Sequence, residues 1–88
     1  METNDTKLKL SIVIPVYNEE RTLRKLIDSV ESVDLPLQKE IILVDDGSKD
    51  KSREILDGYK GKHKVIFQDK NSGKGSAIRR GFKEALGW

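Results

Sequence analysis

Three apolar segments of this chain have the composition of buried β-strands, and a helical pattern of apolar residues follows each of them. Residues 9–17, 39–45 and 63–68 are rich in Ile, Val, Leu and Phe, as expected of strands that are covered on both faces of a sheet. The apolar residues that follow each segment recur every three or four positions, which is typical of amphipathic helices. The pattern therefore predicts six elements in the order β-α-β-α-β-α.

This alternating order predicts an α/β fold with a short parallel sheet and right-handed crossovers. Two successive crossovers in one direction give the strand order 3-2-1 and place the first two helices on one face of the sheet. The third helix then covers the other face and completes a three-layer fold. We expect a polar tail at residues 1–8 and a single domain at residues 9–88. Sheets of this kind usually continue, so the first strand is expected to keep an unpaired edge that would allow a homodimer.

The helical segments carry more specific expectations about caps and buried faces. Asn18 precedes two acids, so we expect it to cap the first helix near the positive end of the helix dipole. We expect the apolar stripe of the third helix to consist of Ala77, Ile78, Phe82, Ala85 and Leu86.

Composition excludes several classes of function. Seventeen Lys and Arg against fifteen Asp and Glu give the 88-residue chain a net charge of +2, which is too small to indicate a nucleic-acid partner. The absence of cysteine excludes disulfides and thiolate metal sites, and a single histidine, His63, cannot build a histidine cluster. No segment has the length and apolar character of a signal peptide or a membrane span. A cytoplasmic location is therefore the default expectation.

Two adjacent carboxylates follow the most apolar strand, where Ile41 to Val44 gives way to Asp45, Asp46 and Gly47. In open α/β sheets, ligands bind just beyond the carboxyl ends of the strands. Three uses of the pair stay open: a turn with a helix cap, a metal site, or acceptance of hydrogen bonds from a ribose hydroxyl or a base N–H. A charge-assisted bond of that last kind contributes about 1.5–3 kcal/mol when it is shielded from water.

The glycine-rich segment Gly73-Lys74-Gly75 lies at the predicted start of the third helix. Backbone amides and the helix dipole converge at such a place, so Lys74 is a candidate contact for a phosphate group. The known phosphate motifs do not match, because a P-loop would need glycine in place of Gln68, and a dinucleotide fingerprint would need it in place of Ile78. A flexible turn with a solvated lysine remains the alternative.

Three segments together resemble family-2 glycosyltransferases of the GT-A fold, and most closely the dolichol- or polyprenyl-phosphate mannose and glucose synthases. The resemblance covers residues 10–87 and rests on IVIPVYNEE at 12–20, EIILVDDGSKD at 40–50 and NSGKGSAIRRG at 71–81. It implies that the chain is the first half of a Rossmann-like nucleotide-sugar domain. The implied function is inverting transfer of a sugar from a UDP- or GDP-sugar to an acceptor such as a polyprenyl phosphate.

The resemblance also assigns residues to the donor site, by their position in the three motifs. Pro15, Tyr17 and Glu19 would line the pocket for the base and ribose. Val44 would pack on the base, and Asp46 would bond to its polar edge or to the ribose. Asp45 would fix the loop that follows the strand. Lys74 completes the set of candidate donor-binding residues.

The resemblance implies further residues that this sequence does not include. The family continues into a fourth strand that ends in Asp-x-Asp, whose carboxylates bind Mg²⁺ or Mn²⁺, and the catalytic base lies further on. We therefore assign no catalytic residue and no metal ligand here, and we expect the 88 residues alone to be inactive and to hold no cofactor. The parent enzyme could be membrane-associated on the cytoplasmic face.

Two other classes of function were compared with this one. A non-catalytic α/β module could bind a nucleotide or a protein partner and self-associate through the open sheet edge. A phosphoacceptor receiver domain fits less well, because its acid pair would follow the first strand. Here the pair follows the second strand.

Overall fold

The computed structural model describes residues 9–34, 38–69 and 73–85, and these form the six elements that the pattern predicts. In chain order they are β1 (Lys9–Val16), α1 (Leu23–Glu31), β2 (Gln38–Asp46), α2 (Ser52–Asp57), β3 (Lys64–Gln68) and α3 (Lys74–Ala85). The polar tail expected at residues 1–8 and the apolar Leu86 lie outside the described residues.

The three strands form one parallel sheet in the order β1-β2-β3. Ile14 of β1 lies opposite Leu43 of β2, which in turn lies opposite Val65 of β3. The predicted strand order and direction are therefore confirmed. Within the described residues β1 pairs only with β2, so the outer edge of β1 carries no strand there.

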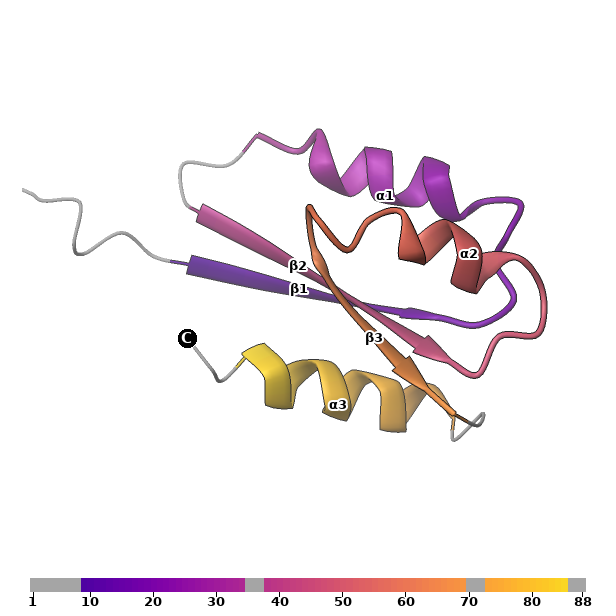
Figure 1. Cartoon of the computed structure of the whole chain (residues 1–88). Helices are drawn as coiled ribbons and strands as arrows, with labels where there is room; N and C mark the ends of the chain where they lie inside the picture. The colour runs from indigo at the N-terminus through magenta and orange to yellow at the C-terminus, as the bar shows by residue number, and fades with distance from the viewer. Residues whose placement is uncertain (1–8, 35–37, 70–72, 86–88) are drawn as a thin grey trace, which may run out of the picture.

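The sheet is covered on both faces, with α1 and α2 on one side and α3 on the other (Figure 1). The core on the first side consists of Ile14, Val16, Leu23, Ile27, Ile41, Leu43, Ile55 and Leu56. The core on the second side consists of Ile42, Val44 and Ala77. Because β2 is the central strand, both sets of its side chains are buried, which explains its unbroken apolar sequence.

The buried face of α3 differs from the predicted stripe. Ala77 and Gly81 are buried against the sheet, whereas the side chain of Phe82 is 54% exposed. A Cβ atom at Gly81 would lie 2.2 Å from Cγ1 of Val13, so the helix backbone approaches β1 closely at this point. Residues four apart share a helix face and Phe82 is turned about 100° away from that face. The expected burial of Phe82 was wrong.

The start of α1 also differs from expectation. The helix begins at Leu23 with Thr22 in the N-cap position, and no side chain caps it. Asn18 lies before the helix in a left-handed conformation, with φ of 51°. Its side-chain oxygen accepts a hydrogen bond from the amide of Lys49 at 2.8 Å. Asn18 therefore joins two loops and does not cap the helix.

Candidate functional site

A small cavity lies at the carboxyl ends of β1 and β2. Its volume is about 280 Å³, and it is lined by Pro15, Val16, Tyr17, Glu19 and Asp46. Four of these residues are among the candidates that the sequence resemblance assigns. The structure thus brings together the end of β1, the loop that follows it and the end of β2, as expected for a ligand site in a parallel α/β sheet.

The cavity combines apolar walls with two carboxylates. Pro15 is partly buried, and the ring of Tyr17 is 38% exposed, so it can contact a planar ligand. Glu19 and Asp46 contribute acceptor oxygens. Two carboxylates repel a phosphate group but accept hydrogen bonds from hydroxyl and N–H groups. The chemistry of the cavity therefore suits a nucleoside better than a diphosphate.

Asp45 and Asp46 point to opposite faces of the sheet, because side chains alternate along a strand. Asp45 is fully buried on the α2 side, and its Oδ2 accepts hydrogen bonds from the amides of Gly47 at 3.1 Å and Ser48 at 3.0 Å. The same oxygen lies 3.2 Å from Nε of Arg53. Asp45 thus fixes the loop after β2, which agrees with the role implied by the resemblance, and the two carboxylates cannot chelate one metal ion together.

Asp46 is held on the α3 side by two donors. Its Oδ1 accepts a hydrogen bond from Nε2 of Gln68 at 2.9 Å, and its Oδ2 accepts one from the amide of Gly73 at 2.9 Å. Gly73 has φ of 94° and immediately precedes α3. Sequence reasoning did not identify Gln68. The strand register could have revealed it, since Gln68 lies opposite Asp46 at the end of the neighbouring strand.

The loop after β1 and the segment after β2 are joined by a set of hydrogen bonds that we call the loop clasp. Among the described residues, five bonds make up the clasp, and each runs from a backbone amide of one segment to a side chain of the other. They are Asn18 N to Ser48 Oγ (2.9 Å), Glu19 N to Ser52 Oγ (2.8 Å), Glu20 N to Asp50 Oδ2 (3.2 Å), Lys49 N to Asn18 Oδ1 (2.8 Å) and Lys51 N to Glu20 Oε1 (3.2 Å).

The carboxylate of Asp50 contributes to both segments. Its Oδ1 accepts a hydrogen bond from the amide of Ser52 at 2.8 Å at the start of α2, and its Oδ2 accepts one from the amide of Glu20. Loss of water contact alone would raise the pKa of Asp50, but the hydrogen bonds from Ser52 and Glu20 outweigh this effect and hold the pKa below its ordinary value. The side chain is therefore charged at neutral pH.

One candidate donor residue, Val44, does not line the cavity, and the place of the Lys74 side chain stays untested. The side chain of Val44 is fully buried and packs with Ile42 and Ala77 in the core beneath α3. The side chain of Val44 therefore does not line the cavity and does not contact a base bound in it in this structure. Lys74 is the first residue of α3, but its side chain lies outside what the structure describes.

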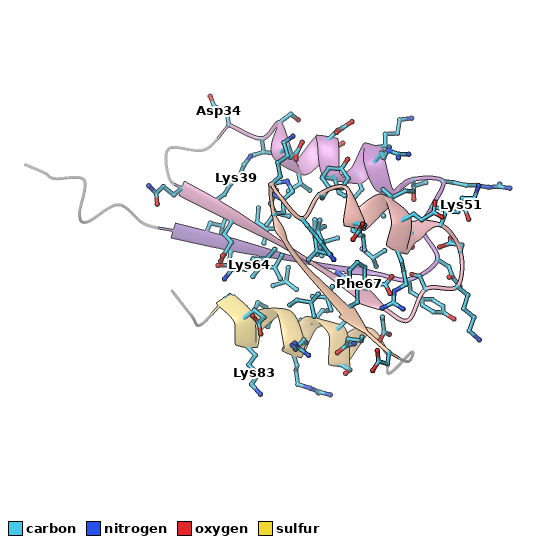
Figure 2. The ribbon with its side chains drawn as sticks, viewed as in Figure 1. Asp34, Lys39, Lys51, Lys64, Phe67 and Lys83 are labelled. Carbon is cyan, nitrogen blue, oxygen red and sulfur yellow. The ribbon has the colours of Figure 1, made fainter. Side chains whose placement is uncertain are left out.

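A larger hollow of about 630 Å³ lies at the opposite end of the sheet, near Lys39 of β2 and Lys64 of β3 (Figure 2). Five of its side chains are paired with each other: Glu31 with Lys62 and His63, and Lys64 with Glu40. The hydrogen bond from His63 is the main cause of the lowered pKa of Glu31. Size alone favours this hollow, but its side chains serve the fold, and it lies away from the strand ends where ligands bind.

The side chain of Lys39 illustrates the structural use of these charges. Its Nζ donates to the backbone oxygens of Val30 at 3.0 Å, Glu31 at 2.8 Å and Val33 at 2.5 Å. These carbonyls lie at the end of α1, where a cation is favoured by the helix dipole. Lys39, which lines the larger hollow, therefore holds the end of α1 in place.

Comparison with known proteins places the chain in a family. The family model described as glycosyl transferase family 2 matches residues 11–87. The chain belongs to glycosyl transferase family 2. The three segments that carry the resemblance all fall within the matched residues.

Several curated members of the glycosyl transferase family 2 are similar to this chain. Dolichyl-phosphate beta-glucosyltransferase ALG5A of Trichomonas vaginalis is 43% identical over 82 residues, which cover 82% of this chain and 25% of the relative. Dolichol-phosphate mannosyltransferase of Pyrococcus furiosus is 40% identical over 82 residues, which cover 91% of this chain and 23% of the relative. Undecaprenyl-phosphate 4-deoxy-4-formamido-L-arabinose transferase of Yersinia pestis is 43% identical over 93 residues, which cover 99% of this chain and 28% of the relative. The chain spans about a quarter of the length of these relatives.

A solved structure shows the same fold. The crystal structure of S. aureus TarS 1-349 matches with a TM-score of 0.75 and 31% sequence identity, over 88% of this chain and 24% of that one. The family-2 chain therefore has the β-α-β-α-β-α arrangement of part of a GT-A glycosyltransferase.

The part of the family-2 chain that the structure describes contains neither a metal-binding group of side chains nor a membrane-spanning helix. In residues 9–34, 38–69 and 73–85, no three His, Cys, Asp or Glu side chains form a group that could hold a metal ion. No helix in these same ranges is both long enough and apolar enough to cross a membrane.

Proposed function

We propose that this chain forms the nucleoside-binding portion of an inverting glycosyltransferase that takes its sugar from a UDP- or GDP-sugar. The observation that supports this most is the cavity at the strand ends, where Pro15, Tyr17, Glu19 and Asp46 meet. Membership of glycosyl transferase family 2 supports a glycosyltransferase as the parent protein, and the cavity suggests which part of the donor these residues contact.

The cavity residues have complementary roles in this proposal. The ring of Tyr17 stacks on the base, and Pro15 forms an apolar wall beside it. Glu19 and Asp46 accept hydrogen bonds from the ribose hydroxyls or from an N–H group of the base. Ligand pockets usually have volumes of about 300–1,000 Å³, so a cavity of about 280 Å³ is small and suits one part of the donor better than the whole nucleotide sugar.

We propose that other parts of the reaction depend on segments of the parent protein outside the matched region, because this region spans about a quarter of the relatives' length. The resemblance assigns Mg²⁺ or Mn²⁺ binding and base catalysis to later segments, and a metal there would offset the charge of the diphosphate as the nucleotide departs. We propose a polyprenyl phosphate as the acceptor, because the names of the similar curated transferases include dolichyl and undecaprenyl phosphates. A position on the cytoplasmic face stays a prediction.

Titration of the chain with UDP and with GDP tests this function. We expect weak binding, since the described residues contain no group of side chains that could hold a metal ion. The affinity should be about tenfold lower in Asp46→Asn, which loses a charge-assisted hydrogen bond. Asp57→Asn is the matched control, because Asp57 is exposed on α2 and, among the described residues, forms an ion pair with Lys60. Equal affinities for the unaltered chain and Asp46→Asn would contradict the proposal, as would an equal loss in Asp57→Asn.

A second candidate function is a protein-binding module that self-associates through β1. It is favoured by one observation, namely that within the described residues β1 pairs with β2 alone and leaves its outer edge open. Such an edge offers unpaired amide and carbonyl groups to another strand. Pro15 removes one donor near the end of β1 and confines any pairing to the residues before it.

A further inference from the structure

The two walls of the cavity come from different parts of the chain, and the strands alone do not fix the distance between them. Asp46 is the last residue of β2, whereas Tyr17 and Glu19 lie in the loop after β1 has ended. The last strand pairing joins Val16 to Asp45. Beyond that pair, the position of Tyr17 and Glu19 depends on contacts of the loop.

The loop clasp supplies these contacts next to the cavity. The amide of Asn18 donates to Ser48, and the amide of Glu19 donates to Ser52, at 2.9 and 2.8 Å. Asn18 stands between the two cavity residues in a left-handed conformation, and its side chain accepts a hydrogen bond from the amide of Lys49. The clasp therefore holds the backbone of the loop at Asn18 and at Glu19.

Two acceptors of the clasp, the hydroxyls of Ser48 and Ser52, belong to buried residues. Ser48 is 7% exposed and Ser52 is fully buried, so water does not readily replace either hydroxyl. The amide of Ser48 is bonded to Asp45, which is anchored in β2 and by Arg53. A continuous path of hydrogen bonds thus runs from the strand that carries Asp46 to the loop that carries Tyr17.

We infer that Asn18, Ser48 and Ser52 are positioning residues of the donor site, which set the distance between the Tyr17–Glu19 wall and the Asp46 wall. None of the three lines the cavity, so they act on the ligand through their neighbours. This inference rests on the proposed function, because it assumes that a nucleoside binds between the two walls. A ligand that contacts both walls loses affinity when their spacing fluctuates.

Ser48→Ala tests this role, with Ser11→Ala as the matched control. The hydroxyl of Ser48 accepts its hydrogen bond from Asn18, and the hydroxyl of Ser11 donates one to Glu40 of the neighbouring strand at 3.1 Å, toward the opposite end of the sheet. Both variants lose one cross-element hydrogen bond, so both lose some stability. We expect Ser48→Ala to bind UDP or GDP about tenfold more weakly than the unaltered chain, and Ser11→Ala to bind within about twofold of it.

Asn18→Gly provides a second variant in case Ser48→Ala does not fold. Glycine adopts the left-handed conformation without strain, so this change removes only the side-chain bond to Lys49. We expect a loss of affinity in the same direction, together with faster amide exchange at residues 18–20. Affinity is measured by titration under conditions where circular dichroism shows each variant to be folded.

The outcomes separate the inference from the proposed function. If the unaltered chain binds no nucleotide, the proposed function fails and the positioning role fails with it. If the unaltered chain binds but Ser48→Ala and Asn18→Gly bind as tightly as Ser11→Ala, the positioning role alone is overturned. A selective loss of affinity in the two clasp variants supports both.

Discussion

At the residue scale, alternation along a strand gives two neighbouring carboxylates separate tasks. Asp45 turns toward α2 and holds the amides of the following loop, whereas Asp46 turns toward α3 and lines the cavity. A metal-binding pair would need both side chains on one face. Glu31 also has a structural role, because its carboxylate joins the end of α1 to His63 and Lys62.

Replacement of Glu31 by Gln is expected to have a pH-dependent effect on stability. Its pKa is lowered in the folded chain, chiefly by the hydrogen bond from His63. A carboxyl group with a lowered pKa stabilises the fold above its unfolded pKa of about 4.3, and this contribution is lost as pH falls through the lower folded value. Glu31→Gln should therefore be less stable than the unaltered chain at pH 6, and the difference should shrink toward pH 3.

Urea unfolding followed by circular dichroism at the two pH values measures this difference. Glu84→Gln is the matched control, because the side chain of Glu84 on α3 is 41% exposed and its Oε2 lies 3.7 Å from Nε of Arg80. Exposed pairs of this kind contribute little, so Glu84→Gln should stay close to the unaltered chain at both pH values. A destabilisation by Glu31→Gln that is constant with pH would contradict this role of its charge.

At the element scale, the packing of α3 on the sheet depends on the absence of a side chain at one position. Gly81 faces Val13 of β1 so closely that a Cβ atom would overlap with it. Gly75 lies in the same helix, and a Cβ atom there would meet nothing within 4 Å. The two glycine positions thus differ in the space that is available for a side chain.

Substitution of these two glycines by alanine should change stability in opposite directions. Gly81→Ala is expected to lower the free energy of unfolding by about 1–3 kcal/mol, because the added methyl group forces the helix away from β1. Gly75→Ala should raise it by about 0.4–1 kcal/mol, since alanine reduces the conformational freedom of the unfolded chain. Chemical denaturation of both variants measures these changes. Stabilisation by both substitutions would show that α3 does not pack on β1 as described.

The elements also show what the sequence can and cannot predict. The unbroken apolar run at 41–44 is typical of a strand covered on both faces. The strand order and the helix faces follow from the alternating β-α order with crossovers in one direction. The burial of Gly81 in place of Phe82 could not be predicted, because an apolar pattern carries no information about how closely a helix approaches the sheet.

The arrangement of the candidate site could also be predicted from the sequence only in part. The motif positions placed Pro15, Tyr17, Glu19 and Asp46 together, because parallel strands end at one edge of the sheet. The role of Asn18 was missed, since its partner Lys49 lies 31 residues away and a local cap was the simpler interpretation.

At the scale of the whole molecule, the chain is a small α/β unit that spans about a quarter of the length of its relatives. Among the described residues, β1 and β3 are the outer strands of the sheet, and each pairs with β2 alone. Small domains bury a modest share of their surface, so their stability is low. The open edge of β1 is a candidate surface for self-association.

We expect weak self-association through this edge. The weight-average sedimentation coefficient should rise with protein concentration, and Leu10→Lys should reduce the rise because a charge on an edge strand opposes pairing. Leu10 is 40% exposed on β1, and Leu26, which is 43% exposed on α1, provides the control Leu26→Lys. A coefficient that does not change with concentration would exclude edge pairing, and an equal effect of both variants would assign the association to another surface.

The most direct test of the proposed donor site is the map of backbone amide signals that shift when UDP or GDP is added to the ¹⁵N-labelled chain. The proposed site predicts that the shifts centre on Tyr17, Glu19 and Asp46 and weaken in Asp46→Asn. Shifts confined to the loop around Lys74, or to residues 62–64 at the larger hollow, would contradict the assignment of the cavity to the nucleoside.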